Sequence, residues 1–427
     1  MDQSAPEKST EKPKARFARK RELVVDAASG IVNDKGVAGL TFAEVAERVG
    51  LSTSSVTYYF RLKEQLAAAA FEKSLGRIES LVSRAAQEPD PRSRVRKYVH
   101  MYFDLHADIH RGREQPITIL SEMRALDDSI REPLRQHYSA IFRKIREFFG
   151  EPESELHQAI NTARAQHLAE AMYWLPVWLF DYSYGDFERV RDRMLDLFDR
   201  GLSVEGAPWE PLPMPSNVDR GLPQAHADFL RVATRLISER GHRGASVDRI
   251  ASELKVTKGS FYHHLEAKEE LVLSCFRYSY ARLAAAQKYA PGKTYWQRLT
   301  STIVRLLQIQ LGGESPLMRT TAIQTLPNEV RAAVFSRSNR VALRFAGTII
   351  DGIAEGTIRA VDPLVAGQVM LSSLNAAYEL HNWAERRGDL HQAIRLYAAA
   401  LVFGLFDNRA IEWAKQPDRV AGADTAG

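Results

Sequence analysis

The chain has 427 residues, a hydrophobic fraction of 45% and a net charge of +5, which fit two or more globular domains with a mild preference for polyanions. Its single cysteine, Cys275, excludes a disulfide within the chain and is typical of a reducing compartment. We find no signal peptide, and the longest apolar runs have ten residues, too few to cross a bilayer, so we expect a cytoplasmic protein.

Residues 1–15 are polar, charged and contain proline, so they are expected to form a disordered basic arm. Residues 1–21 hold seven Lys/Arg against three acids. Such an arm can attract phosphates or follow a minor groove. The alternative is a solvated tail without a specific role.

Residues 16–66 have the pattern of a helix-turn-helix domain. An apolar stripe at helical spacing predicts the first helix, and Gly36 is placed to end it. Thr41 and Glu44 have the spacing of a capping box for the second helix. The stripe of the first helix consists of Val25, Ala28 and Val32.

A short third helix carries hydroxyl and ring side chains, which can contact phosphates, base edges and thymine methyls. One of Tyr58 and Tyr59 is expected to pack inward, because a short helix needs an inward face. Lys63 follows at a helix N-terminus, where backbone amides also favour phosphate. The predicted DNA-contacting residues of this copy are Thr41, Thr53, Ser55, Thr57, Tyr58, Tyr59 and Lys63.

Residues 67–202 are expected to be helical, with breaks at 89–91, 115–116 and 150–152. Residues 203–223 contain five prolines and are expected to form a semi-extended linker. A second helical region is expected at 272–415, and a disordered tail at 416–427. His106 and His110 have helical spacing, but convergent partners for a metal are not evident, so no metal site is predicted.

Residues 224–271 repeat the helix-turn-helix pattern. A shift of 205 residues aligns 28–66 with 233–271 without a gap and gives eight identities. Glycines, the apolar stripe and a final Lys-Glu-x-Leu are preserved, which indicates an internal duplication. The predicted DNA-contacting residues of this copy are Ser246, Lys258, Gly259, Ser260, Tyr262, His263, His264 and Lys268.

The segments SSVTYYFRLKEQL (54–66) and GSFYHHLEAKEEL (259–271) resemble a signature of the TetR/AcrR family of bacterial regulators, roughly G-T-L-Y-Y-H-F-x-x-K-E-x-L. The resemblance covers about fifty residues in each copy. Thr57 replaces the family's first tyrosine, and Leu265 replaces its phenylalanine. The family implies a DNA-binding domain followed by a helical regulatory domain with a dimer interface and a small-molecule pocket. Candidate pocket residues are Tyr102, Phe103, Trp174, Trp178, Tyr182, Tyr378 and His381.

We therefore expect an all-α chain of two tandem units, each a helix-turn-helix domain followed by a helical bundle, packed as an intramolecular pseudo-dimer. The expected function is a ligand-responsive repressor that binds double-stranded operator DNA at the nucleoid, acting as one chain or as a homodimer. Two unlike recognition helices predict an asymmetric operator. The alternative is a protein-interaction module in which one or both copies have lost DNA binding. Catalytic motifs are lacking, so neither an enzyme nor a cofactor is expected.

Overall fold

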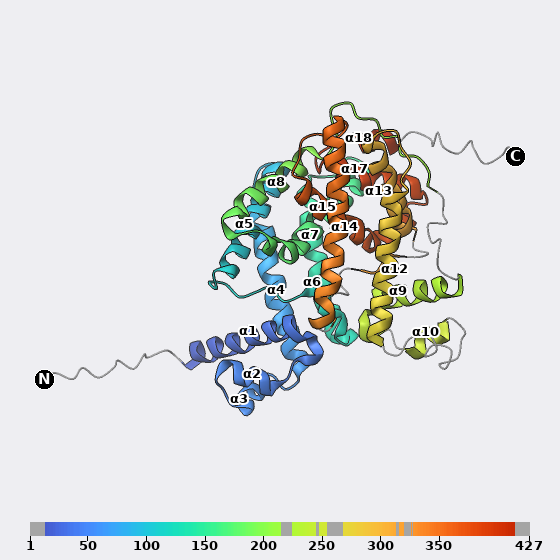
Figure 1. The fold of residues 1–427 in the computed structure, drawn as a ribbon. Coiled ribbons are helices and arrows are strands. Elements are labelled where there is room, and N and C mark those ends of the chain that lie inside the picture. Colours follow the sequence, from blue (N-terminus) through green and yellow to red (C-terminus); the bar gives the residue numbers. More distant parts are fainter. Residues whose placement is uncertain are drawn as a thin grey trace. The chain divides into compact units, whose positions relative to one another are not determined.

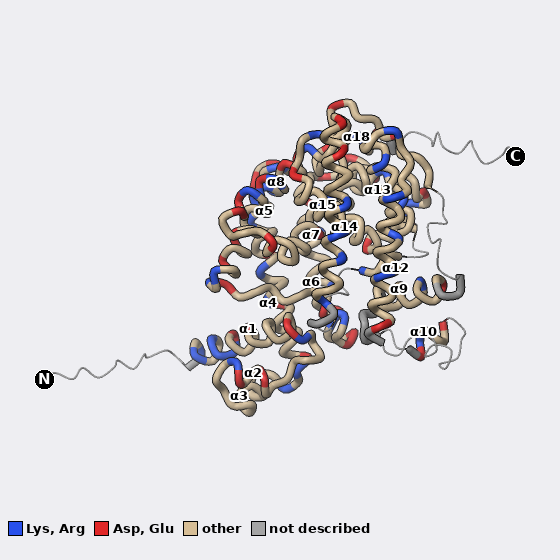
Figure 2. The backbone as a smooth tube through the Cα atoms, in the orientation of Figure 1, with Lys and Arg blue, Asp and Glu red and all other residues tan. Residues whose placement is uncertain are grey.

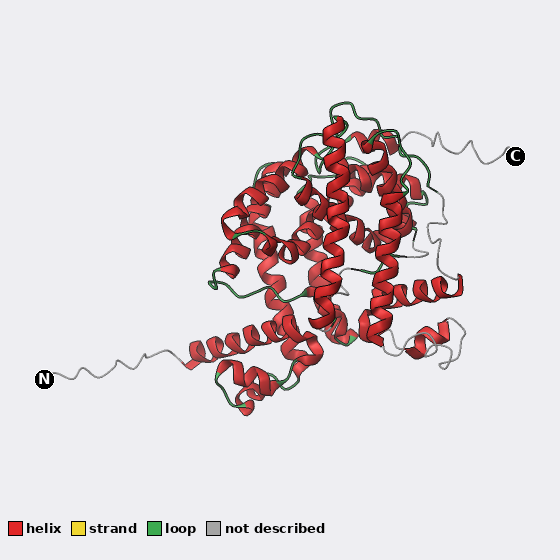
Figure 3. Cartoon of the chain, in the orientation of Figure 1, coloured by secondary structure: helices red, strands yellow, loops and turns green. Residues whose placement is uncertain are grey.

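The computed structural model describes residues 13–214, 224–244, 247–253, 268–312, 316–319, 326 and 328–414. Over these residues the chain is helical almost throughout (Figure 3), which confirms the all-α fold. The β pairing within them is one isolated bridge, between Ser203 and Ile358. Within the same ranges, no helix combines the length and apolar character needed to span a membrane.

The helices of the two halves follow the order expected from the duplication (Figure 1). Those of the first half are α1 (Pro13–Gly39), α2 (Phe42–Val49), α3 (Thr53–Tyr59), α4 (Lys63–Ala85), α5 (Pro91–His110), η1 (Leu120–Ala125), α6 (Asp128–Glu147), α7 (Glu155–Trp178), η2 (Leu179–Asp181), η3 (Tyr184–Asp186) and α8 (Phe187–Arg200). Those of the second half are α9 (Gln224–Gly244), α10 (Val247–Glu253), α12 (Lys268–Lys288), α13 (Tyr295–Leu311), α14 (Asn328–Glu355), α15 (Pro363–Ala376), η5 (Ala377–Leu380), α16 (His381–Arg386), α17 (Leu390–Val402) and α18 (Arg409–Ala414).

The chain divides into two compact units. The first comprises residues 1–77 and 115–137 and contains the first helix-turn-helix domain. The second comprises residues 78–114 and 138–427, which include most of the first regulatory region, the second helix-turn-helix segment and the second regulatory region. Residues 115–137 thus group with the DNA-binding domain, although the sequence division at residue 66 assigned them to the regulatory region.

Helix α1 begins at Pro13, inside the stretch 1–15 that was predicted to be disordered. Proline suits the first helical turn, where an N–H has no partner within the helix. The predicted stripe of Val25, Ala28 and Val32 is buried. Gly36 adopts φ 70°, a left-handed conformation that interrupts the helix where the sequence predicted its end.

A buried hydroxyl cluster of Ser29, Ser74 and Thr118 joins three segments of the first unit. The Thr118 amide donates to Ser74 Oγ at 2.9 Å, and the Ser74 hydroxyl donates to Thr118 Oγ1 at 2.9 Å. The Thr118 hydroxyl in turn lies 3.0 Å from Ser29 Oγ. Because each group is removed from water, these bonds determine how residues 117–122 pack on α1 and α4.

Two longer side chains tie the same segment to the end of α1. Asn33 donates through Nδ2 to the Ile117 carbonyl at 3.0 Å and accepts from the Ile119 amide at 2.8 Å. Glu122 Oε2 accepts from the Val37 amide at 3.0 Å, directly after the turn at Gly36. These bonds explain why residues 115–137 group with the first DNA-binding domain.

Within the second unit, helices from the two halves pack on each other, as expected for an intramolecular pseudo-dimer. Helix α7 packs against α15 and α17, and α8 packs against α15 (Figure 1). The buried Arg164 guanidinium donates to the Asp407 carbonyl at 2.6 Å and to Asn408 Oδ1 at 2.7 Å. Burial lowers the pKa of Arg164 to about 10, so it stays charged at neutral pH. Because Arg164 also donates to Asn161 Oδ1 at 2.9 Å, this charged side chain is shared between a partner in the first half and two in the second.

The ends of α8 and α17 cross at two glycines. The Leu202 amide donates to the Val402 carbonyl and the Leu405 amide to the Phe198 carbonyl, both at 2.7 Å. A Cβ on Gly201 would lie 2.3 Å from Val402 O, and one on Gly404 would lie 2.9 Å from Phe198 O. Only residues without a side chain allow the backbones to approach this closely.

The first part of the Pro-rich linker packs on α13 and is not a free spacer. Trp296 Nε1 donates to the Pro208 carbonyl at 2.8 Å, and Gln297 Nε2 donates to the Glu210 carbonyl at 3.1 Å. Residues 215–223, the rest of the predicted linker, lie outside the described residues.

We expect Gly201→Ala to lower the free energy of unfolding by more than about 2 kcal/mol, because a side chain at φ 62° is strained and its Cβ would collide with the Val402 carbonyl. Gly206→Ala is the matched control, since Gly206 has φ 71° but open space around an added Cβ, and should cost about 1 kcal/mol. Urea unfolding would measure both. Equal losses would contradict a close crossing at Gly201.

We expect Thr118→Val to lower the free energy of unfolding by about 1–3 kcal/mol, because valine keeps the shape but removes the hydroxyl that Ser29 and Ser74 contact. Thr118→Ser keeps the hydroxyl and should lose only about 1 kcal/mol, for the missing methyl group. Chemical denaturation would compare the variants. A valine variant as stable as the parent would show that the hydroxyl cluster contributes nothing.

Candidate DNA-binding site

The recognition helix of the first copy, α3, has a defined start and one buried face. Ser52 caps it, with Ser52 Oγ accepting from the Ser55 amide at 3.2 Å. Val56 is fully buried and Phe60, which follows the helix, is 6% exposed. The opposite face is open to solvent and consists of Thr53, Ser54, Thr57 and Tyr58.

The two tyrosines of α3 lie in different environments. Tyr58 is 76% exposed, whereas Tyr59 is half-buried. The ring of Phe17, from α1, lies 4.8 Å from the ring of Tyr59 and 5.9 Å from that of Tyr58. Tyr59 thus provides part of the inward face of the short helix, and Tyr58 projects toward solvent.

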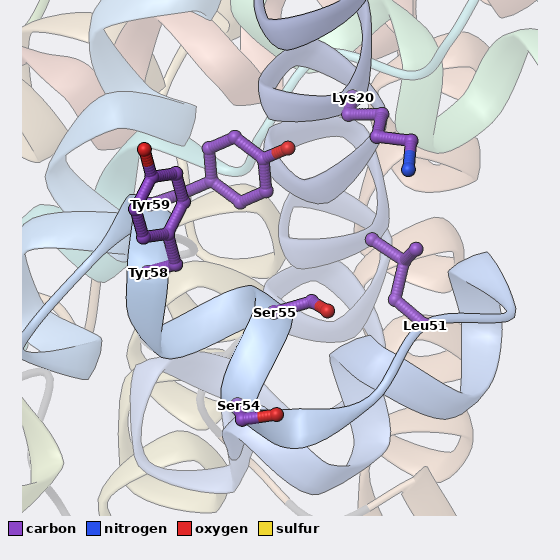
Figure 4. Close-up of a pocket in the computed structure, with 6 residues that line it drawn as sticks. All are labelled: Lys20, Leu51, Ser54, Ser55, Tyr58 and Tyr59. Atoms are coloured by element: carbon purple, nitrogen blue, oxygen red, sulfur yellow. The ribbon is translucent and has the colours of Figure 1, made fainter.

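A shallow hollow of about 250 Å³ lies between α3 and α1 (Figure 4). The Lys20 ammonium reaches toward it from α1, and two serine hydroxyls from the first turn of α3 line it. A cation beside hydroxyls and a helix start suits an anionic oxygen. The lining residues are Lys20, Leu51, Ser54, Ser55, Tyr58 and Tyr59.

Lysine and arginine residues gather in the first turns of α1 (Figure 2), and one of them, Lys20, lines the hollow. The Arg21 guanidinium lies 4.9 Å from the centre of the Phe60 ring. One of these basic residues, Lys14, falls in the stretch 1–15 that was predicted to be disordered, and it is helical. The basic residues of these turns are Lys14, Arg16, Arg19, Lys20 and Arg21.

The other predicted residues of the first copy flank α3. Thr41 caps α2, with Oγ1 accepting from the Glu44 amide at 3.3 Å. The Glu44 carboxylate pairs with Lys35 at 2.8 Å. Lys63 is half-buried and begins α4. Thr53, Ser55, Thr57, Tyr58 and Tyr59 all belong to α3, and of these Thr53, Thr57 and Tyr58 are exposed.

In the second copy, Leu230, Ala233 and Ile237 correspond to Val25, Ala28 and Val32 and are buried in α9. Lys268 is the first residue of α12. The other DNA-contacting residues predicted for this copy lie outside the described residues. They are Ser246, Lys258, Gly259, Ser260, Tyr262, His263 and His264.

The candidate ligand-pocket residues fall into three groups on different helices. In α5, Tyr102 and Phe103 are buried, and the Tyr102 ring lies 4.8 Å from that of His106. The second group, at the end of α7 and after it, is Trp174, Trp178 and Tyr182, with Trp174 lying 6.3 Å from Phe335 of α14. The third is the stacked pair Tyr378 and His381.

Two other reactive groups are enclosed by the core. Burial raises the pKa of Cys275 to about 12, so its thiol stays protonated at neutral pH. His106 is 3% exposed beside Tyr102. In the part of the chain that the structure describes, no three metal-ligating side chains converge on a common point.

Comparison with known proteins gives two matches within this one chain. The family model described as bacterial regulatory proteins, tetR family, matches residues 24–70 and again residues 229–275. These segments contain both helix-turn-helix copies, from the first helix to the start of the helix that follows the signature.

Similar curated proteins are regulators of the helix-turn-helix type. BetI of Burkholderia cenocepacia (strain HI2424) is 36% identical over 87 residues, covering 20% of this chain and 45% of that protein. BetI of Rhizobium meliloti (strain 1021) is 32% identical over 85 residues, covering 20% and 42%. This chain therefore spans less than half the length of these relatives. The crystal structure of apo AibR is 24% identical with a TM-score of 0.34, covering 42% of this chain and 98% of that one.

The duplicated signature, the all-α fold and the double match of the family model agree. This chain therefore carries, in tandem, two segments that match the model of the tetR family of bacterial regulatory proteins.

Proposed function

We propose that this chain is a sequence-specific, ligand-responsive transcriptional repressor that reads an asymmetric operator with two unlike recognition helices. The observation that carries the proposal is the open face of α3. Its hydroxyls and the 76% exposed Tyr58 are presented on a helix fixed by Val56 and by the Ser52 cap. Such a helix fits a major groove and offers donors, acceptors and a ring to base edges.

The surroundings of α3 suit the DNA backbone. Lys20 lines the hollow beside the start of α3, and Lys63 begins the next helix. Lysine is unfavourable at a helix N-terminus because of the helix dipole, whereas a phosphate there is favourable. A phosphate beside Lys63 would therefore offset the unfavourable position of its ammonium group. The lysine recurs as Lys268 in the second copy, which supports the same role there.

The packing of the regulatory helices supports one chain as the DNA-binding unit. Helices α7 and α8 are already covered by α15 and α17 of the same chain. The buried His167 donates through Nε2 to the Tyr397 carbonyl at 2.8 Å, and Arg164 binds Asp407 and Asn408. A second chain would have to displace these bonds in order to use the same helices as an interface.

The two copies should prefer different half-sites because their recognition segments differ. Thr57, Tyr58 and Tyr59 of the first copy correspond to Tyr262, His263 and His264 of the second. The hydroxyl of threonine, the phenol of tyrosine and the imidazole of histidine present different hydrogen-bonding groups to a base edge. The operator should therefore lack twofold symmetry.

The operator can be tested by selecting duplexes from a random pool with the full chain and measuring affinity for single base-pair changes. Tyr58→Ala should relax preference in one half-site only, by about 1–3 kcal/mol if Tyr58 contacts a base, and His263→Ala should relax it in the other. Lys63→Ala is the matched control, and it should weaken binding to all sequences alike. It should also reduce the salt slope, that is the slope of log affinity against log salt concentration, by about one. A palindromic site whose halves are equally sensitive to Tyr58→Ala would reject the proposal.

The ligand response is assigned to the region around Trp174. This buried side chain of α7 contacts Phe335 of α14, so it lies where the first half meets the second. A ligand that separates or tightens these helices would favour one spacing of the DNA-binding domains.

We expect Trp174→Phe to weaken release of the operator by an effector while changing operator affinity by less than about tenfold, below about 1.4 kcal/mol. Phenylalanine is used because alanine would open a large cavity at this buried position. Effectors would be found by screening small molecules for a rise in melting temperature of the parent protein. A variant that responds as the parent does would place the pocket elsewhere.

A further inference from the structure

The first turns of α1 contain an aromatic residue, Phe17. A shift of 205 residues places Leu222, which has no ring, at the corresponding position of the second copy.

Phe17 forms a three-ring cluster with the two tyrosines of the recognition helix. The Phe17 ring meets Tyr58 at 5.9 Å with an interplanar angle of 82° and Tyr59 at 4.8 Å with an angle of 48°. The rings of Tyr58 and Tyr59 lie 5.6 Å apart at 77°. These separations and tilts are those that favour attraction between aromatic rings.

The cluster limits where Tyr58 can point. Tyr58 is 76% exposed on a helix of seven residues, so solvent offers its ring little restraint. An exposed side chain changes rotamer freely unless a neighbour favours one of them. Phe17, itself 42% exposed, is a neighbour of that kind on a different helix, α1.

We propose that Phe17 is a positioning residue for DNA recognition: it holds Tyr58 and Tyr59 in one arrangement, so that base preference of the first copy depends on a residue of α1. The inference rests on the proposed function, since it specifies how one of the two recognition helices is prepared for DNA. Because Leu222 corresponds to Phe17 in the second copy, this role belongs to the first half-site only.

The same turn of α1 has a second, separable role. Lys20 and Arg21 follow Phe17 by three and four residues, so the three side chains share one side of the helix. Lys20 lines the hollow beside α3 and Arg21 lies over Phe60. Charge at Lys20 should act on all sequences alike, whereas the ring of Phe17 should act on sequence preference.

The test uses the full chain and a duplex that the parent protein selects from a random pool. Phe17→Leu should weaken binding about three- to tenfold, lose discrimination in one half-site only, and leave the salt slope unchanged. Phe17→Tyr, which keeps a ring, should restore both affinity and preference. Lys20→Ala should instead reduce the salt slope by about one without changing preference.

Leu23→Ala is the control for general effects on α1, because Leu23 lies on the same helix and is 49% exposed. It should bind as the parent does, and melting temperatures should show that all variants fold. If Phe17→Leu keeps the parent's affinity and preference in both half-sites, or loses both half-sites equally, the positioning role is overturned. If the parent protein itself selects no sequence, the proposed function fails, and the inference fails with it.

Discussion

The architecture depends on a close backbone contact between the two halves, where Gly201 and Gly404 meet at the ends of α8 and α17. Because neither residue has a side chain, the amides of Leu202 and Leu405 can each reach a carbonyl of the opposite half. That contact brings α7 onto α15 and α17, where the Arg164 guanidinium finds its partners. The contact between the two copies is thus formed within one chain. Because the two copies need not be identical, their sequences can differ from each other.

Divergence is visible in the segments that follow α5 and α13. The Met318 amide donates to Ser279 Oγ at 2.8 Å, as the Thr118 amide donates to Ser74 Oγ at 2.9 Å. A serine hydroxyl that accepts from a backbone amide is thus found in both halves. In the first half the Thr118 hydroxyl also donates to Ser29 Oγ, and the thioether side chain of Met318 has no such donor. The two halves therefore share the amide-to-serine bond but differ in the side-chain bond beside it.

The sequence predicted those features that depend on local spacing. The stripe of Val25, Ala28 and Val32, the turn at Gly36 and the exposed hydroxyl face of α3 all follow from residues a few positions apart. Features that depend on distant residues were missed. Trp296 binding Pro208 anchors part of the linker that composition predicted to be semi-extended, and Thr118 lies in the short run 117–120, whose bonds to Ser29 and Ser74 no local pattern indicates. Phe17 lies within residues 16–66, which were predicted to form the helix-turn-helix domain, but its contacts with Tyr58 and Tyr59 join residues distant in the sequence.

The central claim is that one chain supplies both recognition helices, and the mass of the protein on its operator tests it most directly. Native mass spectrometry of the selected duplex with the full chain should give one chain of 48.1 kDa per duplex at protein concentrations near the dissociation constant. The complex should keep that composition when the protein is in moderate excess. A complex that forms only with two chains, and never with one, would contradict the account, because the two recognition helices would then come from separate chains.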